Sequence, residues 1–211
     1  TLTTTQAVAI TVTNVNEAPT FTSGATATVS ENVSTSTAVY TAVATDVDAG
    51  TTLTYTLSGT DAALFNIDSS TGAVTFKASP NYESPTDSGA DNVYNVTVGA
   101  SDGTLTTTQT VAITVTNVNE APAFTSGATA TVAENVSTST AVYTAVATDV
   151  DAGTTLTYSL SGADAALFNI DSTTGVVTFK ASPNYESPAD AGGNNVYDIS
   201  VSASDGTLTT T

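Results

Sequence analysis

The 211-residue sequence contains no cysteine, histidine, methionine, tryptophan or arginine, and it has only two lysines. The lack of cysteine excludes a disulfide framework and a thiolate metal site. The lack of histidine removes the side chain that most often acts as a general base. The sequence has no glycine-rich phosphate loop, and no base stands where it could activate a serine or threonine. We therefore expect a protein that is not an enzyme.

Positive charge is scarce, because 20 Asp and Glu residues stand against the two lysines and give a net charge of −18. Nucleic acids and anionic membranes are bound through clustered lysine and arginine, so the sequence predicts neither partner. A surface of this charge attracts cations instead. Long hydrophobic runs are also missing. None approaches the roughly 20 residues of a membrane span, and we expect no direct membrane insertion of this segment.

What the sequence does contain is a unit of 103 residues written twice. Residues 18–108 align with residues 121–211 without a gap, and 14 of these 91 columns differ. A repeat of this length is a complete domain rather than one turn of a solenoid. The predicted organisation is a complete repeat over 18–120, a repeat over 121–211 that lacks its last strand, and a preceding segment over 1–17.

Alternation of apolar and polar residues with a period of two is the dominant local pattern. Threonine and valine are abundant, and β-branched residues fit a pleated, half-buried surface. Seven short strands in about 100 residues are typical of a Greek-key sandwich, so we expect all-β, tandem, immunoglobulin-like β-sandwiches stacked end to end. The expected strands of the complete repeat lie near residues 25–30, 37–45, 52–58, 64–67, 73–77, 93–100 and 104–116.

The alternation also predicts which side chains face the inside of the sandwich. One helical turn is expected over residues 61–65, with Asp61 as its N-cap. Isolated aspartates in turns usually cap their own backbone, and we expect this role for Asp61, Asp68, Asp87 and Asp91. The predicted inner rows consist of Val29, Val39, Val43, Leu53, Tyr55, Leu57, Phe65, Ile67, Val74, Phe76, Tyr94, Val96, Val98, Ile113 and Val115.

The first residues duplicate a strand whose own sandwich is missing. Thr1–Thr5 are identical to Thr104–Thr108 and to Thr207–Thr211, so residues 1–17 correspond to a final strand and its linker. An unpaired hydrophobic strand edge is an aggregation risk. Two explanations stay open. The chain is a window of a longer tandem array, or residues 1–17 complete the last sandwich of a neighbouring molecule by strand addition and build a head-to-tail fibre.

Strand direction places the acidic residues at the two ends of each sandwich. The turn after the second strand carries Asp46 and Asp48, and the turn after the sixth carries Asp102. Both turns reach the same end. Glu31 and Glu83 reach the opposite end, where the linker to the next repeat starts. Gathering these carboxylates with those of the next repeat would be strongly repulsive without cations.

The chemistry of these side chains favours one metal. Hard oxygen donors without histidine or cysteine suit Ca²⁺, which takes about six to eight such ligands in flexible geometry. Mg²⁺ prefers fewer protein ligands, and Zn²⁺ favours histidine or cysteine. The candidate metal ligands are Asn14, Asn16, Glu17, Glu31, Asp46, Asp48, Asn81, Glu83, Asp102, Asn117, Asn119, Glu120, Glu134, Asp149, Asp151, Asn184, Glu186 and Asp205.

Five short motifs carry a resemblance to a known family. They are Ser30-Glu31-Asn32, Asp46-Val47-Asp48, Asn81-Tyr82-Glu83, Ala100-Ser101-Asp102-Gly103 and Asn117-Val118-Asn119-Glu120-Ala121-Pro122. With these motifs in this order, the chain resembles the cadherin repeat, and more closely the cadherin-like repeats of large bacterial surface proteins. The resemblance implies up to three Ca²⁺ ions at each junction between repeats, which make a string of domains rigid.

The sequence departs from the family pattern at several ligand positions. Asn14 and Asn117 stand where the family often has aspartate in the linker, and Asn81 and Asn184 replace an aspartate of a second motif. Each amide keeps a carbonyl ligand but loses a charge. We therefore expect calcium affinity on the weak side of the roughly 10⁻⁴–10⁻³ M range of extracellular modules.

The leading hypothesis is a calcium-rigidified structural repeat of an extracellular or cell-surface stalk, adhesin or filament, with neighbouring repeats or identical subunits as partners. Two alternatives stay open. A module that recognises glycan or protein would use the variable columns 86–99 and 189–202, although most changes there are small polar or alanine swaps. An accessory domain of a secreted hydrolase would have an enzyme domain beyond this segment.

Overall fold

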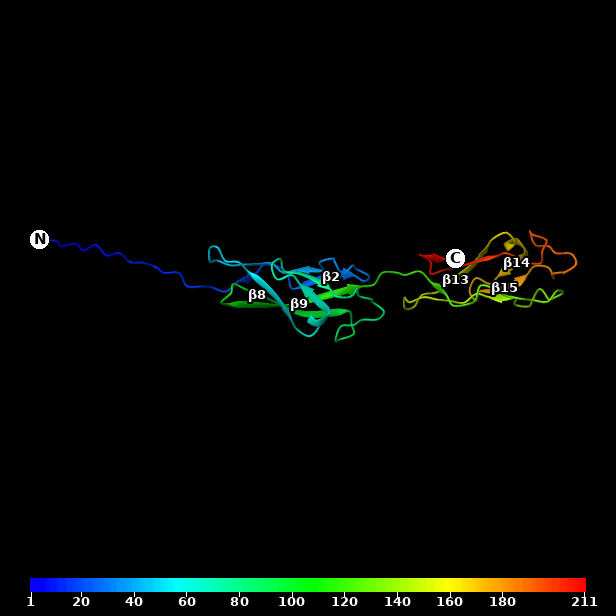
Figure 1. The fold of residues 1–211 in the computed structure, drawn as a ribbon, viewed down its shortest axis with the longest axis horizontal. Coiled ribbons are helices and arrows are strands. Elements are labelled where there is room, and N and C mark those ends of the chain that lie inside the picture. Colours follow the sequence, from blue (N-terminus) through cyan, green and yellow to red (C-terminus); the bar gives the residue numbers. More distant parts are fainter. The chain divides into compact units, whose positions relative to one another are not determined.

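Two compact units make up the structure, a computed structural model that describes residues 1–211 (Figure 1). The first unit spans Thr1–Val118 and the second spans Asn119–Thr211. Both consist of strands and turns, with one short 3₁₀ turn each, Ala62–Leu64 and Ala165–Leu167. No helix in the structure has the length and apolar character that a membrane crossing requires. The predicted all-β class is confirmed.

A four-stranded sheet forms one side of the first unit. Its order is β2-β9-β8-β5, and β2 and β9 pair in parallel while the other pairs are antiparallel. This parallel pairing confirms that the strands predicted near residues 25–30 and 104–116 run in the same direction. The strands are β2 (Thr26–Ser30), β5 (Thr54–Ser58), β8 (Val93–Ser101) and β9 (Thr106–Thr116).

A three-stranded antiparallel sheet with the order β3-β7-β6 completes the sandwich. Strands β1 and β4 form a separate short antiparallel pair. The expected strands therefore occur within a few residues of their predicted ranges, except that the second one is split into β3 and β4. The bounds are β1 (Thr20–Phe21), β3 (Tyr40–Thr41), β4 (Ala44–Thr45), β6 (Phe65–Ile67) and β7 (Ala73–Phe76).

The second unit repeats this arrangement with fewer strands. Its sheets have the orders β10-β12, β11-β15-β14 and β13-β16-β17, and all of their pairs are antiparallel. Residues 129–133, the counterpart of β2, form no strand. The bounds are β10 (Ala123–Phe124), β11 (Tyr143–Thr144), β12 (Ala147–Thr148), β13 (Thr157–Ser161), β14 (Phe168–Ile170), β15 (Val176–Phe179), β16 (Ser200–Ser204) and β17 (Thr209–Thr210).

Alternate side chains of β8 and β9 form the centre of the first core. Tyr94 and Ile113 are Cα partners across the two strands, and both are fully buried. The Tyr94 ring stands edge-on to Phe65 and Phe76, with centroids 5.7 and 5.1 Å apart. Such contacts are worth about 0.5–1.5 kcal/mol beyond the burial of the rings. Val111, which the expected inner rows did not include, is also fully buried.

Val43 is exposed, so its assignment to the inner rows is wrong, whereas the other members of those rows are buried or packed against the core. The chain between β3 and β4 turns inward at Ala42, whose N–H donates to the Gly72 carbonyl oxygen at 2.9 Å. Gly72 has φ +73°, and a Cβ on it would lie 2.4 Å from the Ala42 carbonyl oxygen. Only glycine fits at this contact. The contact turns Ala42 inward in place of Val43, so the alternation of buried and exposed residues differs here from the one that the local sequence pattern predicts.

The helical turn is confirmed in its position but not in its cap. Asp61 stands at the N-cap position of Ala62–Leu64, yet its side chain makes no capping hydrogen bond. The buried carboxylate instead accepts hydrogen bonds from the N–H groups of Ser88 at 2.8 Å and Asn95 at 2.7 Å. The expected local role of Asp61 is therefore wrong, because the side chain tethers distant segments.

The other three turn aspartates do serve their own turns. Asp68, Asp87 and Asp91 accept hydrogen bonds from backbone N–H groups two to five residues further along the chain. The N–H of Thr71 is the main cause that holds the pKa of Asp68 below its ordinary value. These contacts confirm the expectation that they cap local backbone.

Residues 1–17 form no strand, and their side chains are exposed. The segment Thr1–Thr13 differs from Thr104–Thr116, which contains β9, only at Ala7, where β9 has Thr110. Nearly the same sequence is therefore a strand where β2 and β8 supply partners, and no strand where they do not.

The duplicated sequence allows a matched test of core burial. Ile113 is fully buried, whereas its counterpart Ile10 is 86% exposed. We expect Ile113→Ala to lower the stability of the first unit by about 2–5 kcal/mol, because it removes a large side chain from a packed core. Ile10→Ala should leave the stability of the dilute monomer unchanged. Urea unfolding followed by hydrogen exchange of β8 peptides checks both, and equal effects would contradict the assigned core.

Candidate metal centre

Two aspartates form a compact turn at one end of the first unit. Asp46 directly follows β4, and its Oδ1 accepts a hydrogen bond from the N–H of Asp48 at 2.8 Å. This Asx-type contact fixes the turn between β4 and β5. The second oxygen, Asp46 Oδ2, is buried and has no hydrogen-bond partner. A buried carboxylate oxygen without a partner is rare and requires an explanation, such as an ion.

The segment that precedes the sandwich docks on this end. The Asn14 amide donates to Asp48 Oδ1, and the N–H of Glu17 donates to Asp48 Oδ2 at 3.0 Å. The Asn16 amide donates to Asp102 Oδ2 at 2.7 Å. The turn after β4 and the turn after β8 therefore lie at one end of the sandwich, as predicted, and the preceding segment connects them.

Hydrogen bonds hold these carboxyl groups in their charged form. The Asn14 amide is the main cause of a lowered pKa at Asp48, and the nearby charge of Asp102 opposes it. The Asn16 amide is the main cause of a lowered pKa at Asp102, with the N–H groups of Leu105 and Thr104 next. Two neighbouring carboxylates thus stay ionised because donors surround them.

The second unit builds the same end from its own residues. The Asn119 amide donates to Asp205 Oδ2 at 2.6 Å, and the N–H of Glu120 donates to Asp151 Oδ2 at 2.9 Å. Asp149 Oδ1 accepts from the N–H of Asp151 at 2.9 Å, and Asp149 Oδ2 is buried without a hydrogen-bond partner. The Asn119 amide also lowers the pKa of Asp205. Both copies therefore share the geometry and the unpartnered oxygen.

The opposite end of the first unit gathers two glutamates. Glu31 follows β2 and is buried, and its carboxylate accepts hydrogen bonds from the N–H groups of Tyr82 and Val118, each at 2.9 Å. One carboxylate oxygen of Glu83 lies within 4.8 Å of one of Glu31. Because β2 and β9 run in parallel, the end of β9 reaches the same place. The predicted clustering of these two glutamates is found.

Several other candidate ligands are engaged locally or exposed. Asn81 Oδ1 accepts from the N–H of Ser84 at 2.8 Å, and Asn184 Oδ1 accepts from the N–H of Glu186 at 2.9 Å, so both amides cap their own turns. Glu134 is exposed and accepts from the N–H of Tyr185 at 3.1 Å. The Glu186 side chain is exposed. The Asn117 side chain is exposed as well.

Three residues that support the site were not predicted. Asp61 and Asp87 fasten the loop that carries Glu83, and Asp87 does so by accepting from the N–H of Asn92 at 3.1 Å. The Asn92 amide then donates to the Tyr82 carbonyl oxygen at 2.9 Å. A signal for this role exists in the sequence. Both aspartates recur in the second repeat, whereas the surface residue Asp91 is replaced there by asparagine.

The donor set at each end fits a hard divalent cation. It contains carboxylate, amide and backbone oxygens and no nitrogen or sulfur ligand, which is the preference of Ca²⁺. The buried, unpartnered oxygens Asp46 Oδ2 and Asp149 Oδ2 are the observation that a bound ion would explain. An asparagine amide that now donates can offer its oxygen after a 180° rotation about its last bond. Metal ligation by these residues stays a prediction.

Comparison with known proteins gives one family. The model described as Cadherin domain matches residues 25–116 and 128–211. Human Protocadherin Fat 4 is 34% identical over 189 residues, which cover 84% of this chain and 4% of that protein. Human Cadherin EGF LAG seven-pass G-type receptor 2 is 34% identical over 192 residues, which cover 88% of this chain and 6% of that protein. The chain thus spans a small part of the length of these relatives.

A solved structure agrees with the fold. Human Protocadherin-24 EC1-2 superposes with a TM-score of 0.64 and covers 93% of each chain, at 22% sequence identity. At this identity the likeness concerns the fold, and it confirms tandem sandwiches of this type.

The lowered pKa values give a prediction in the presence of chelator. Folded-state pKa values of Asp102 and Asp205 lie below the ordinary value of 3.8, so docking by Asn16 and Asn119 is complete above that pH. It should weaken as the pH falls through the lowered values, because protonation removes the negative charge that strengthens the hydrogen bond from each amide. The side-chain amide signals of Asn16 and Asn119 in NMR spectra measure this release.

The variant Asp102→Asn is the matched control. It should remove the pH transition at Asn16 and leave the transition at Asn119 in place, because the second unit has its own aspartate. Loss of both transitions, or of neither, would contradict the local cause assigned here.

Proposed function

Because this chain belongs to the cadherin family, whose domains are extracellular, we propose that it is a calcium-rigidified structural repeat of an extracellular fibre, stalk or adhesin. Cadherins are adhesion proteins and not enzymes, and the proposed role is accordingly non-enzymatic. The likeness of its motifs to bacterial cadherin-like repeats leads us to propose a bacterial surface protein as the source.

The observation that carries this proposal is the docking of each linker on the aspartates of the sandwich that follows it. In both units the linker approaches the same two carboxylates, and a further aspartate oxygen is buried beside them without a partner. Such an oxygen costs about 1–3 kcal/mol or more if nothing compensates it. A cation held there would offset this cost and the repulsion between the carboxylates.

We assign the ligands by the end of the sandwich to which they belong. The carboxylates of Asp149, Asp151 and Asp205 would hold Ca²⁺ with the rotated amide of Asn119. At the end of the preceding repeat, Glu31 and Glu83 would supply the facing oxygens, and Glu120 would join them from the linker. A calcium ion would bridge oxygens from both repeats, and this bridge would restrict bending at the linker.

The proposed repeats are residues 18–120 and 121–211, with residues 1–17 as the strand and linker of a preceding repeat. In this arrangement each repeat has one end that supplies glutamates and one that supplies aspartates. The proposed partners are therefore neighbouring repeats or identical subunits, arranged head to tail.

Chelation gives the direct test. We expect removal of Ca²⁺ with EDTA to lower the melting temperature, and to increase bending of the two-repeat unit in small-angle scattering. Both effects follow because uncompensated carboxylates repel one another and loosen the linker. Titration back should restore them with a midpoint in the range of roughly 10⁻⁴–10⁻³ M or weaker. An unchanged melt and envelope would contradict the proposal.

A pair of variants separates ligands from ordinary surface acids. Asp149→Asn should weaken the calcium response by raising the midpoint about tenfold or more, because a charged ligand becomes neutral. Asp91→Asn should leave the midpoint unchanged, since Asp91 serves its own turn and asparagine stands at this place in the second repeat. Asp61 is unsuitable as a control because its carboxylate holds two distant backbone groups. Isothermal titration calorimetry would compare the Ca²⁺ affinity of the two variants. A larger loss of affinity in Asp91→Asn than in Asp149→Asn would contradict the assignment of the ligands.

A further inference from the structure

Four polar side chains are buried between the core of the first unit and the end that carries Glu31 and Glu83, which we call the glutamate end. Asp61, Asp87 and Asn92 are 3%, 5% and 8% exposed, and the candidate ligand Glu31 is 3% exposed. Buried polar groups are costly unless hydrogen bonds compensate them. The partners of these four side chains therefore show which segments they hold in place.

The two aspartates fasten the loop that follows Glu83. Asp61 Oδ1 accepts a hydrogen bond from the N–H of Ser88 at 2.8 Å, and Asp61 Oδ2 accepts from the N–H of Asn95 in β8 at 2.7 Å. Asp87 Oδ1 accepts from the N–H of Asn92 at 3.1 Å. The loop is thus fixed to buried carboxylates at both Ser88 and Asn92, and the residues between these two are exposed.

Asn92 connects this loop to the core and to the glutamate end. Its carbonyl oxygen accepts from the N–H of Val115 in β9 at 2.9 Å, and its side-chain amide donates to the Tyr82 carbonyl oxygen at 2.9 Å. The Tyr82 carbonyl belongs to the planar peptide group that links Tyr82 to Glu83. Asn92 therefore fixes the orientation of the peptide from which Glu83 starts.

The same peptide segment continues to Glu31. The N–H of Tyr82 donates to Glu31 Oε2, and the N–H of Val118 donates to Glu31 Oε1, each at 2.9 Å. The Glu31 carboxylate is thus held at both oxygens by backbone donors. One hydrogen-bonded path runs from Asp87 through Asn92 and Tyr82 to this carboxylate.

The backbone of Asn92 limits which residue can take this place. Its φ is +62°, in the left-handed region that asparagine and glycine tolerate better than most residues. Glycine would adopt this backbone but has no amide, and an ionised aspartate has no donor. Asparagine combines the backbone conformation with the donor that reaches Tyr82.

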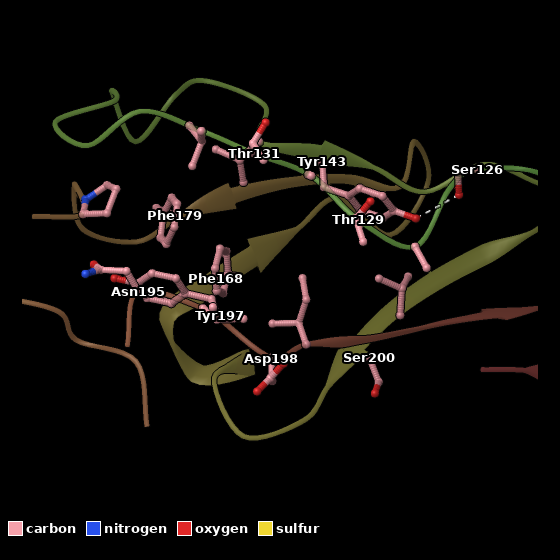
Figure 2. Close-up of a pocket in the computed structure, with 18 of the residues that line it drawn as sticks. Ser126, Thr129, Thr131, Tyr143, Phe168, Phe179, Asn195, Tyr197, Asp198 and Ser200 are labelled. Atoms are coloured by element: carbon pink, nitrogen blue, oxygen red, sulfur yellow. Dashed lines mark hydrogen bonds between the residues drawn. The ribbon is translucent and has the colours of Figure 1, made fainter. Parts of the chain in front are cut away.

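The second unit contains the same path. Asn195 also has φ +62°, its amide donates to the Tyr185 carbonyl oxygen at 3.0 Å, and the N–H of Tyr185 donates to Glu134 at 3.1 Å. Figure 2 shows the Asn195 amide directed away from the rings of Phe168 and Tyr197. The amide is therefore oriented toward its backbone partner and not into the aromatic core.

The path persists although the residues around it change between the two copies. Among residues 87–95, the exposed residues Ser88, Ala90, Asp91 and Asn95 are replaced by Ala191, Gly193, Asn194 and Asp198. Asp87 and Asn92 are the same in both copies. The exposed part of the loop thus varies while the two buried members of the path stay.

We infer that Asn92, and Asn195 in the second unit, are positioning residues for the carboxylates of the glutamate end. They act through the peptide group after Tyr82 or Tyr185, which orients the next glutamate and holds the buried or half-turned carboxylate of Glu31 or Glu134. This inference rests on the proposed calcium binding and names the residues that preorganise its glutamate ligands. Loss of the hydrogen-bonded support of metal ligands typically lowers metal affinity by about 10–100-fold.

A pair of glycine substitutions in the full chain tests the inference. Asn92→Gly removes the amide and keeps the backbone conformation, because glycine tolerates a positive φ. Ala90→Gly is the matched control. It places glycine at another position of positive φ in the same loop, where φ is +50°, and the second unit already has Gly193 there.

The first measurement needs no metal. In the presence of EDTA, we expect the Tyr82 amide of Asn92→Gly to exchange its hydrogen about five- to tenfold faster in NMR spectra, which corresponds to the loss of one hydrogen bond. The Val98 amide in the middle of β8 should keep its rate, and Ala90→Gly should change neither amide. An unchanged Tyr82 amide, or equal acceleration at Tyr82 and Val98, would overturn the inference.

The second measurement is a titration with CaCl₂ in the calorimeter. Asn92→Gly should raise the midpoint about tenfold, and Ala90→Gly should leave it unchanged. An unchanged midpoint in Asn92→Gly, or an equal increase in Ala90→Gly, would refute the positioning role.

Asn92→Asp serves as the second variant if Asn92→Gly does not fold. It keeps the size of the side chain but loses the donor, and its added negative charge would by itself strengthen Ca²⁺ binding. Weaker binding in this variant therefore has to come from the lost hydrogen bond. Binding that is unchanged or tighter would speak against the inference.

The calcium proposal and the positioning inference fail in different ways. If the unchanged chain does not respond to CaCl₂, the calcium proposal is rejected, and with it the role of Asn92 toward an ion. If the unchanged chain responds and its Asn92 variants respond equally, the positioning inference alone is rejected.

Discussion

The hydrogen bonds from each linker to the aspartates at the end of its sandwich fix how the chain enters each unit. They join Asp48 and Asp102, which stand far apart in the sequence, through the preceding segment. The aspartates can meet there because strand direction brings the turns after β4 and β8 to one end, and parallel pairing of β2 with β9 brings the glutamates to the other. The first unit therefore has chemically different ends, with aspartates at one and glutamates at the other.

Much of this architecture could be predicted because alternation and turn residues are local signals. The ranges of β5 to β9 and the grouping of Asp48 with Asp102 follow from them. The local pattern gives a wrong prediction where a contact with a residue far away in the sequence determines the orientation of a side chain. Ala42 points inward because Gly72 lies against it. The Asp61 carboxylate does not cap its own turn, because it accepts from the N–H of Ser88 in a distant loop and from the N–H of Asn95 in β8. Neither contact has a signal within a few residues of the position.

The two units show what the last strand contributes, since their sequences are otherwise nearly the same. Tyr94 is fully buried and its counterpart Tyr197 is half-buried, although each ring meets the same two phenylalanines at nearly equal distances. The aromatic contacts therefore persist without β9, whereas burial and strand pairing at the border do not. Local packing fixes the core, and the final strand closes it against water.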